Sequence, residues 1–379
     1  MKYDVILNQF NEHNEIGIIL AKKYNISTSI IIIKDDEREK YNELKKVYEE
    51  IIPSCNIKGI IIDKGDNKKI SELVSEYIKS NLLINLTGGE RINALLLLKE
   101  GSYYNSDCIY VDLLNMKSYL FSKDINILEE NFEDLKIDEI TKLSGANIIN
   151  DSNYLVDKED ISFVINGILN HLDLWEEYKK KLYDNNIFIH NYKDQSVVVV
   201  NKAELDDNDL KLLYTVLKYI KGIGSISYHE SKDRIEVNFN NNYLKGFIFK
   251  SGTWLEVLTN KVVEEIREID EVKSGVEFFW SNDAKMVKNE LDVVAIKDSV
   301  LVCISCKDSE KYDEDALNEL EVYSKKIGGD NVIKILVATK KPIKKTIIDR
   351  AKEMNINLII LDKDINKFKH TLIEAINKK

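Results

Sequence analysis

The sequence is poor in the residues and patterns that mark several classes of protein. Only 2 prolines and 15 glycines occur in 379 residues and no polar tract is long, which argues against wholesale disorder. The four cysteines, Cys55, Cys108, Cys303 and Cys306, do not make a disulfide framework in so long a chain. No apolar run approaches the roughly 20 residues that span a bilayer, and the N-terminal MKYDVIL carries an acid where a signal peptide has basic residues. We therefore expect an ordered cytoplasmic protein that makes no membrane contact.

The chain also lacks an overall basic charge. Its 54 Lys and Arg against 65 Asp and Glu leave a formal net charge of -11. Such a chain repels nucleic acid on average, because affinity for a polyanion comes mostly from Lys and Arg at phosphates. From Lys250 to the end, however, 23 basic residues nearly balance 24 acidic ones. The C-terminal third is therefore the better candidate for contact with a long polyanion.

The first 122 residues alternate short β-branched runs with stretches of helical periodicity. Strands that alternate with helices and are apolar on both faces predict a parallel sheet covered on both sides. We expect a Rossmann-like α/β domain over residues 1–148. Its predicted strands are 3–7, 28–33, 59–62, 82–86 and 108–113, and its predicted helices are 13–24, 37–52, 68–79 and 91–99.

The middle of the chain predicts a small spacer over residues 149–245. Residues 123–160 are acidic and resemble a linker with short helices, and a helix is expected at 161–181. A strand at 195–200, a helix at 206–219 and strands at 225–229 and 234–239 follow. Helices followed by a hairpin also suit a winged helix, but the scarcity of basic residues favours an α+β spacer over a DNA reader.

Residues 246–379 predict a mixed sheet with helices on its flanks. The expected order is a helix, three strands, a helix, a strand, a helix and a last strand. The corresponding ranges are 253–269, then 275–280, 290–296 and 300–307, then 314–327, 332–338, 344–355 and 358–361.

Two strands of this unit suggest a metal-dependent site. Asp292 lies early in one strand and Lys307 ends the next, and a tight turn joins them, so carboxylate and ammonium should meet at one sheet edge. Hard divalent ions prefer oxygen ligands, which Asp292, Glu256 in SGTWLE and the backbone carbonyl of Cys306 would supply. Lys307 would orient water or stabilise charge in phosphodiester hydrolysis. The competing interpretation is a surface ion pair worth less than about 1 kcal/mol.

Other residues of this unit carry weaker signals. The two thiols of the CISC string point to opposite faces of a strand, which argues against zinc. Trp254 and Trp280 suit core packing better than base stacking. A basic cluster suits either nucleic-acid backbone or a solvated helix face, and consists of Lys340, Lys341, Lys344, Lys345, Arg350 and Lys352.

A glycine-rich turn in the N-terminal domain suggests a ligand site. LINLTGGERINALLL places Thr87, Gly88 and Gly89 after a buried strand and Arg91 in the first turn of a helix. Ligands collect at the carboxyl ends of parallel strands, where helix N-terminal N–H groups face anions, so a phosphate-bearing ligand is implied. The loop 8–12 ends at the same sheet edge. Each segment is also consistent with an ordinary turn or helix cap.

The ordered set of motifs resembles a known family. WLE, then NELDVV, a strand ending in CK, a helix ending in GG and another strand resemble the PD-(D/E)xK nuclease superfamily, and more narrowly the restriction-endonuclease-like half of CRISPR-associated CARF nucleases. The strand-TGG-helix pattern resembles the CARF domain, whose corresponding loop contacts cyclic oligoadenylate. The resemblance implies a Mn²⁺- or Mg²⁺-dependent nuclease of type III CRISPR defence that cuts single-stranded RNA or DNA.

The resemblance also implies site residues and a partner. Cyclic tetra-adenylate has twofold symmetry, so a C2 homodimer would let each protomer contact half the ring. The implied ligand-binding residues are Gln9, Phe10, Asn11, Thr87, Gly88, Gly89, Glu90 and Arg91, and the implied catalytic residues are Glu256, Asp292, Ser305 and Lys307.

Two motifs depart from the family pattern. Ser305 stands where the superfamily has an acid, and Glu90 and Arg91 stand where CARF domains usually have Thr-Lys. Two other functions therefore stay open. One is a ligand-gated nucleic-acid-binding regulator with an inactive nuclease fold, and the other is a Rossmann-type nucleotide enzyme with an unrelated C-terminal module.

Overall fold

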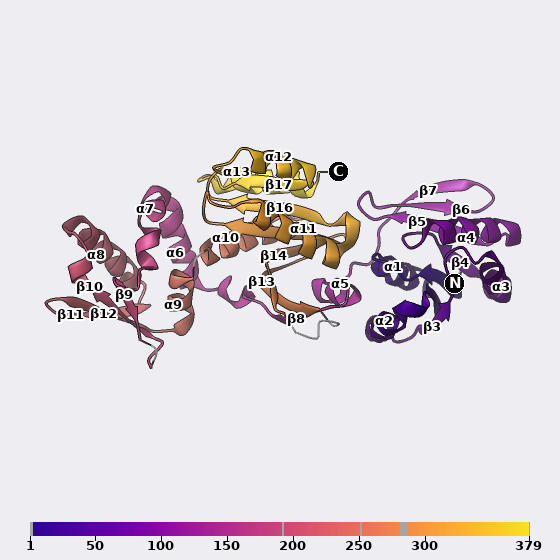
Figure 1. Ribbon diagram of the computed structural model, residues 1–379, viewed down its shortest axis with the longest axis horizontal. Helices are drawn as coiled ribbons and strands as arrows, with labels where there is room; N and C mark the ends of the chain where they lie inside the picture. Colours follow the sequence, from indigo (N-terminus) through magenta and orange to yellow (C-terminus); the bar gives the residue numbers. More distant parts are fainter. Residues whose placement is uncertain (1–2, 192, 251, 281–286, 379) are drawn as a thin grey trace.

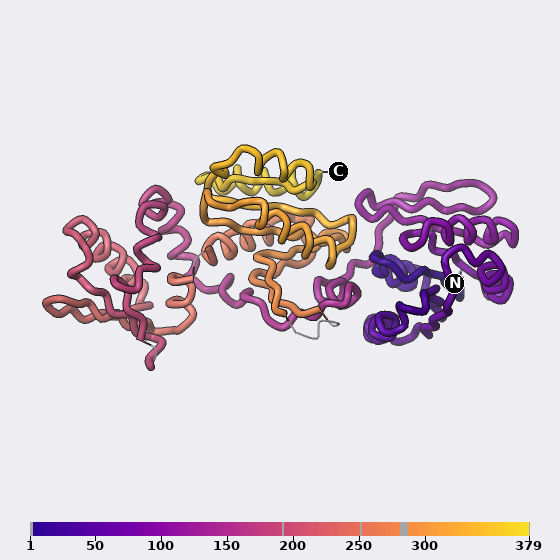
Figure 2. Tube along the Cα trace, viewed as in Figure 1, coloured from indigo at the N-terminus to yellow at the C-terminus, as the bar shows by residue number. Residues whose placement is uncertain are grey.

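Three sheets form three units that lie in a row. A computed structural model describes residues 3–191, 193–250, 252–280 and 287–378. The unit built from the middle of the sequence lies at one end of the elongated molecule, and the C-terminal unit lies between it and the N-terminal unit (Figures 1 and 2). The order of units in space therefore differs from their order along the chain.

The N-terminal unit contains the predicted Rossmann-like sheet. Its order is β3-β2-β1-β4-β5-β6-β7, parallel through β5 and antiparallel from β5 to β7. The strands are β1 (Val5–Gln9), β2 (Thr28–Ile33), β3 (Asn56–Ile61), β4 (Leu82–Asn85), β5 (Asp107–Asp112), β6 (Lys117–Phe121) and β7 (Ile125–Glu129). The helices are α1 (Asn14–Tyr24), α2 (Arg38–Ile51), α3 (Asn67–Tyr77) and α4 (Arg91–Tyr104).

The acidic stretch expected to be a linker contains regular structure. It holds β7, α5 (Ile137–Leu143) and β8 (Ala146–Asn150). All five residues of β7 are exposed, so none of its side chains belongs to the core. β8 pairs antiparallel with a strand of the C-terminal unit, although the sequence placed it at the first domain boundary.

The middle unit is a four-stranded antiparallel sheet with helices, as expected for an α+β spacer. Its order is β11-β12-β10-β9. The single helix expected at 161–181 is divided at His171 into two. The elements are α6 (Glu159–Asn170), α7 (Leu172–Leu182), β9 (Phe188–His190), β10 (Val197–Asn201), α8 (Asp207–Gly222), β11 (Ile226–Glu230), β12 (Arg234–Phe239) and α9 (Asn242–Phe249).

The C-terminal unit has the predicted mixed α/β architecture. Its sheet order is β17-β16-β15-β14-β13-β8, parallel from β17 to β15 and antiparallel from there on. The last helix was not expected from the sequence. The elements are α10 (Thr253–Glu264), β13 (Glu271–Trp280), β14 (Asn289–Lys297), β15 (Val300–Lys307), α11 (Glu314–Gly328), β16 (Ile333–Ala338), α12 (Thr346–Glu353), β17 (Ile356–Ile360) and α13 (Ile365–Ile376).

Both faces of the central sheet are buried, each in a different apolar cluster. Val294 and Cys303 belong to a cluster that continues into the N-terminal unit. Val293 and Ile304 belong to a second cluster that continues through α10 into the four-stranded unit. Because strand side chains alternate between faces, neighbouring residues of β14 and β15 connect the sheet to different units. The strands that carry the predicted site are thus held rigidly from both sides.

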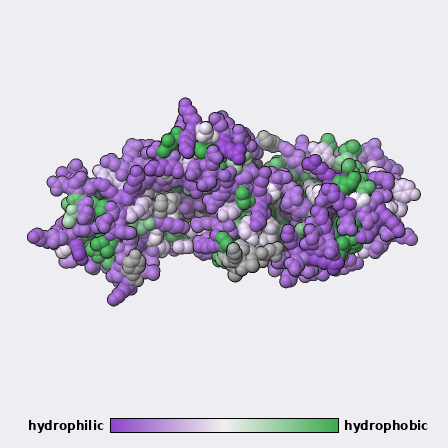
Figure 3. Space-filling model, in the orientation of Figure 1, coloured by the Kyte–Doolittle hydropathy of each residue, from purple (hydrophilic) through white to green (hydrophobic). Residues whose placement is uncertain are grey.

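The surface is mainly hydrophilic. Figure 3 shows scattered hydrophobic patches, several of them over the N-terminal unit. Within the described ranges, none of the helices combines the length and apolar character needed to cross a bilayer.

Candidate active site and ligand loop

The hairpin of β14 and β15 positions the central pair of the candidate active site. Its two-residue turn, 298–299, has φ angles of 51° and 63°, as in the type I′ turns that suit a twisted hairpin. The register pairs Val293 with Ile304. Asp292, one residue earlier, therefore lies beside the end of β15, where Lys307 follows.

Asp292 is held by β15 through one of its oxygens. Its Oδ2 accepts hydrogen bonds from the Ser305 hydroxyl at 3.1 Å and from the Cys306 backbone N–H at 2.6 Å. The Lys307 ammonium lies 4.0 Å from the same oxygen. The carboxylate and the ammonium thus meet at the sheet edge, as predicted from the strand order. Within the described ranges Oδ1 receives no hydrogen bond and is free to bind another group.

Glu256 faces this pair from the first turn of α10. The helix begins after Gly252, which has a φ of 88°, and the Glu256 residue is 7% exposed. Burial, reinforced by the negative charge of Asp292, raises the pKa of Glu256 although Lys250 opposes the shift. Its carboxylate has no hydrogen-bond or ion-pair partner among the described residues. Two neighbouring carboxylates whose negative charge is so little neutralised by other groups are suited to bind a divalent cation.

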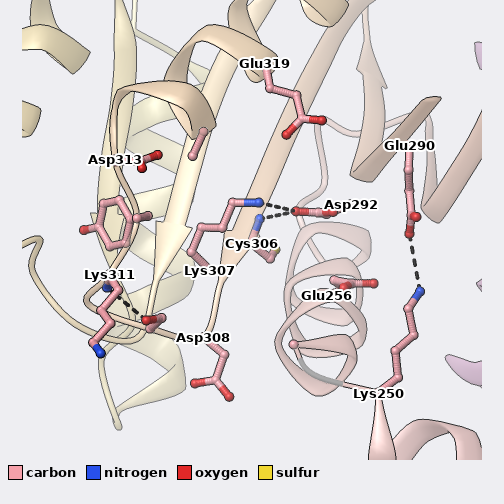
Figure 4. A pocket seen from close by; sticks show the side chains of 14 residues that line it. Lys250, Glu256, Glu290, Asp292, Cys306, Lys307, Asp308, Lys311, Asp313 and Glu319 are labelled. Atoms are coloured by element: carbon pink, nitrogen blue, oxygen red, sulfur yellow. Dashed lines mark hydrogen bonds and ion pairs between the residues drawn. The ribbon is translucent and has the colours of Figure 1, made fainter.

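A cleft of about 540 Å³ surrounds the site (Figure 4). The cleft brings together Glu256, Asp292 and Lys307, all predicted from the sequence. It also contains several charged side chains that sequence reasoning missed. Glu290 lies two residues before Asp292, a spacing that places both on one strand face and was a usable signal. The other missed charged residues are Lys250, Asp308, Lys311, Asp313 and Glu319.

Asp308, the residue after Lys307, anchors the end of β15. It is buried and accepts hydrogen bonds from the indole N–H groups of Trp175 and Trp254, each at 2.8 Å. The Lys179 ammonium lies 2.9 Å away. Trp175 and Lys179 belong to α7 of the middle unit, so this contact ties that unit to the edge of the cleft. Trp254 is 2% exposed, in agreement with the core role expected for it.

The CISC string and the basic cluster add no charged side chain to the described lining of the cleft. Cys303 and Cys306 belong to different apolar clusters, so their thiols diverge as the strand pattern indicated. The Cys306 contact with Asp292 is made by its N–H, and its carbonyl as a metal ligand stays a prediction. Lys340 pairs with Glu176 at 3.2 Å. Within the described ranges, the cations lining the cleft are Lys250, Lys307 and Lys311, without a member of the basic cluster.

Two glycines pack closely against the loop after β1, at the carboxyl edge of the N-terminal sheet. Gly88 and Gly89 have φ angles of 76° and 77°. A Cβ at Gly88 would collide with Asn11 Oδ1, and one at Gly89 would lie 2.7 Å from Gln9 Cβ. Gln9 Oε1 accepts a hydrogen bond from the Glu90 N–H at 3.1 Å. Gln9 Nε2 is buried without a partner in the described part of the chain, as a donor awaiting a ligand would be.

Not every predicted ligand residue faces open space. Thr87 is buried, and its hydroxyl accepts a hydrogen bond from the Val111 N–H at 2.8 Å, so it connects β4 to β5. Phe10 packs against the apolar cluster shared with the C-terminal unit. Arg91 is exposed in the first turn of α4. Direct contact with a ligand therefore suits Arg91 better than Thr87 or Phe10.

Two lysines that were not predicted from the sequence form ion pairs with Glu90 and explain why an acid can stand at this position. Lys34 and Lys64 lie 2.8 and 2.9 Å from its two carboxylate oxygens. Hydrogen bonds from Lys34 and then Lys64 lower the pKa of Glu90 to about 2. Lys34 directly follows β2 and Lys64 follows β3, so both belong to the same carboxyl edge. Glu90, which differs from the family pattern, thus holds two lysines at the candidate ligand site.

The loop after β1 also contacts the C-terminal unit. A Cβ at Gly329 would lie 2.9 Å from His13 Cε1 and 3.3 Å from the Glu12 carbonyl oxygen. Ligand atoms of Glu12, His13 and Asp330 lie within 4.8 Å of one another. Burial lowers the pKa of His13, but Glu15 and the other two acids raise it by more, so the net shift is upward. The residues after β1 therefore lie between the candidate ligand site and the end of α11.

Comparison with known proteins finds a family model that matches the C-terminal unit and solved structures that share the fold of the whole chain. Residues 245–378 match the family model of the Card1-like endonuclease domain. Can2 from Sulfobacillus thermosulfidooxidans, solved with cyclic tetra-adenylate, has a TM-score of 0.73 and 17% identity over 99% of this chain and 98% of its own. VC1899 from Vibrio cholerae has a TM-score of 0.73 and 18% identity over 98% and 97%.

A third structure is a type III CRISPR defence DNA nuclease activated by cyclic oligoadenylate. Its TM-score is 0.52 and its identity 11%, and the match covers 93% of this chain but 52% of that one. No curated protein sequence matches the chain significantly. The resemblance to CARF-domain ancillary nucleases is thus confirmed at the level of the fold, and the C-terminal unit matches the Card1-like endonuclease family.

Proposed function

We propose that this protein is a nuclease activated by cyclic oligoadenylate, specifically cyclic tetra-adenylate, which cuts single-stranded RNA or DNA in type III CRISPR defence. The observation that carries the proposal is the meeting of Asp292, Lys307 and Glu256 in one cleft of a Card1-like endonuclease domain. Can2, which shares the fold, was solved with cyclic tetra-adenylate. Metal dependence, substrate and activator are all parts of the proposal.

In this proposal Glu256 and Asp292 hold Mn²⁺ or Mg²⁺. The buried carboxylate of Glu256 lacks a partner within the described ranges, and Asp292 keeps Oδ1 free because both its hydrogen bonds fall on Oδ2. When bound, the cation would lower the pKa of water and neutralise charge on the phosphorus centre. Lys307, beside Asp292, orients the water or stabilises the charge that develops on the phosphate oxygens.

The carboxyl edge of the N-terminal sheet would bind the ring. Lys34 and Lys64 share the single negative charge of Glu90, so together with Arg91 they leave a net positive charge for phosphates, and the backbone at Gly88 and Gly89 permits close approach. Gln9 Nε2, which has no partner among the residues that the structure describes, would donate to an adenine edge.

A homodimer would present this edge twice around a twofold axis, matching the symmetry of the ring. Large apolar side chains exposed on the N-terminal unit support such an interface, which would remove them from water. They include Ile92, Leu95, Tyr103, Ile125 and Ile127.

Activation requires coupling between the two sites, and the segment 9–13 lies between the candidate ligand site and the end of α11. Gln9 and Asn11 pack against the glycine turn, while His13 packs against Gly329 at the end of α11. A ring that prefers one position of this loop would shift the population of one arrangement of the endonuclease domain.

The test is cleavage of labelled single strands by the full-length protein with Mn²⁺ or Mg²⁺ and each cyclic oligoadenylate. We expect cleavage with cyclic tetra-adenylate, and a loss of about 10²-fold or more in Asp292→Ala and Lys307→Ala. Glu264→Gln, an exposed site at the other end of α10, serves as the control with full activity. Absence of cleavage under every ring and metal would contradict the proposal.

A second function is favoured by Ser305, which leaves the superfamily's acid position without a charge. The chain would then be a ligand-gated regulator that retains nucleic acid without cutting it. Ring-dependent gel shifts of intact strands, with no cleavage over hours, would support this function over the first.

A further inference from the structure

The hydroxyl of Ser305 leaves the candidate metal site one carboxylate short. The residue is 8% exposed and donates its hydrogen bond to Asp292 Oδ2, so it contributes no charge. A divalent cation with oxygen ligands is stabilised by each added carboxylate. Another acid of the cleft can supply the third carboxylate, and the structure restricts the choice.

Most acids of the cleft are already engaged. Glu290 lies 3.5 Å from the Lys250 ammonium. Asp308 is bound by two indoles and Lys179. Asp313 caps α11 by accepting a hydrogen bond from the Asp315 N–H. These three carboxylates therefore serve other partners.

Glu319 is different. It lines the cleft together with Asp292 and Lys307, on the side opposite Glu256, and Figure 4 shows its carboxylate reaching from α11 toward Asp292. Among the described residues it has no hydrogen-bond or ion-pair partner. The neighbouring Leu320 is 2% exposed and Leu317 is fully buried, which fixes the helix face that carries Glu319.

We propose that Glu319 supplies the third carboxylate of the divalent-cation site and replaces the acid missing at Ser305. The inference rests on the proposed function, because it concerns the same cleft. Glu319 comes from a helix, whereas Asp292 and Lys307 come from the sheet. The cation would therefore be bound between α11 on one side and β14 and α10 on the other.

The position of Glu319 also connects this site to the ligand loop. α11 continues from Glu319 to Gly328, a distance of roughly 14 Å at about 1.5 Å per residue. The next residue, Gly329, packs against His13. A movement of the ligand loop transmitted along the rigid helix would thus change how Glu319 faces Asp292.

The experiment measures Mn²⁺ binding to the full-length protein by electron paramagnetic resonance of the free ion, with and without cyclic tetra-adenylate. We expect Glu319→Gln to weaken Mn²⁺ binding by about tenfold or more. The double variant Glu319→Gln with Ser305→Glu should recover most of that loss, because it returns a carboxylate to the strand position. Glu314→Gln, on the same helix but outside the cleft, should bind Mn²⁺ within twofold of the parent protein.

Circular dichroism verifies folding of each variant, and Ser305→Asp replaces Ser305→Glu if the longer side chain unfolds the strand. Unchanged Mn²⁺ binding in Glu319→Gln overturns the inference, as does absence of Mn²⁺ binding by the parent. The inference is also overturned if both rescue variants fold but neither recovers Mn²⁺ binding.

Cleavage assays on the same samples separate this inference from the proposed function. If Glu319→Gln loses Mn²⁺ and the parent cuts no strand under any ring, the cation site stands and the nuclease activity fails. If Glu319→Gln binds Mn²⁺ and cuts like the parent, the activity stands and the inference fails.

Discussion

Replacing the buried Glu256 by glutamine should stabilise the metal-free protein at alkaline pH. The Glu256 residue is 7% exposed, and its carboxyl group faces Asp292 and has no hydrogen-bond or ion-pair partner in the described ranges. Burial and then the charge of Asp292 raise its pKa in the folded state above the ordinary 4.5. Folding therefore favours the neutral carboxyl, and ionisation costs free energy. Glutamine has the same shape and stays neutral.

The sign of the pH dependence follows from that shift. Below the unfolded pKa near 4.5 the carboxyl is neutral in both states, so parent and Glu256→Gln should be equally stable. As the pH rises from there through the raised pKa of Glu256 in the folded state, the free energy of unfolding falls for the parent protein but not for Glu256→Gln. Each pKa unit corresponds to about 1.4 kcal/mol. Allowing for shared titration with Asp292, we expect a gain on the order of 1–3 kcal/mol at pH 8.

Thermal unfolding in the presence of a chelator, at pH 4.5 and pH 8, measures this difference. Glu264→Gln, the exposed change at the end of α10, should leave the unfolding midpoint unchanged at both values. A Glu256→Gln variant that is less stable than the parent at pH 8, or that gains equally at both pH values, would refute the reasoning.

The two remaining predictions concern glycines with positive φ. Gly89→Ala should weaken binding of cyclic tetra-adenylate by about tenfold or more in isothermal titration calorimetry, because its Cβ would lie 2.7 Å from Gln9 Cβ; unchanged affinity would contradict the assigned ligand loop. Gly329→Ala should keep ring binding but reduce ring-stimulated cleavage, since its Cβ would lie 2.9 Å from His13 Cε1, and full stimulation would argue against this contact as the route of activation. Gly145→Ala is the control for both: it also places alanine at a positive φ, 81°, but with nothing within 4 Å of the added Cβ.

Strands made of continuous apolar runs were predictable from the sequence. The runs that form β1, β2 and β15 are almost wholly buried, and their composition alone indicated strands. β7 was missed because its five residues lie in an acidic stretch that resembles a linker, although Ile125, Asn126 and Ile127 alternate as in a strand. α13 was missed although Phe368, Leu372 and Ile376 have helical spacing and are buried, a signal that could have been found.

The candidate site divides in the same way. Asp292 and Lys307 were predictable together because a two-residue turn fixes the hairpin register locally. Glu319 and the lysines beside Glu90 were not, since their approach depends on how a helix packs and how separate strands align.

The sequence by itself determined the alternation of elements, the hairpin that joins Asp292 to Lys307 and the glycine turn after β4, because backbone propensity and side-chain periodicity act over a few residues. Only the tertiary structure decided that the middle unit lies at one end, that β8 completes the C-terminal sheet, and that His13 meets Gly329. Those contacts join segments far apart in the chain, and they form because burying apolar faces against each other lowers the free energy of the whole fold.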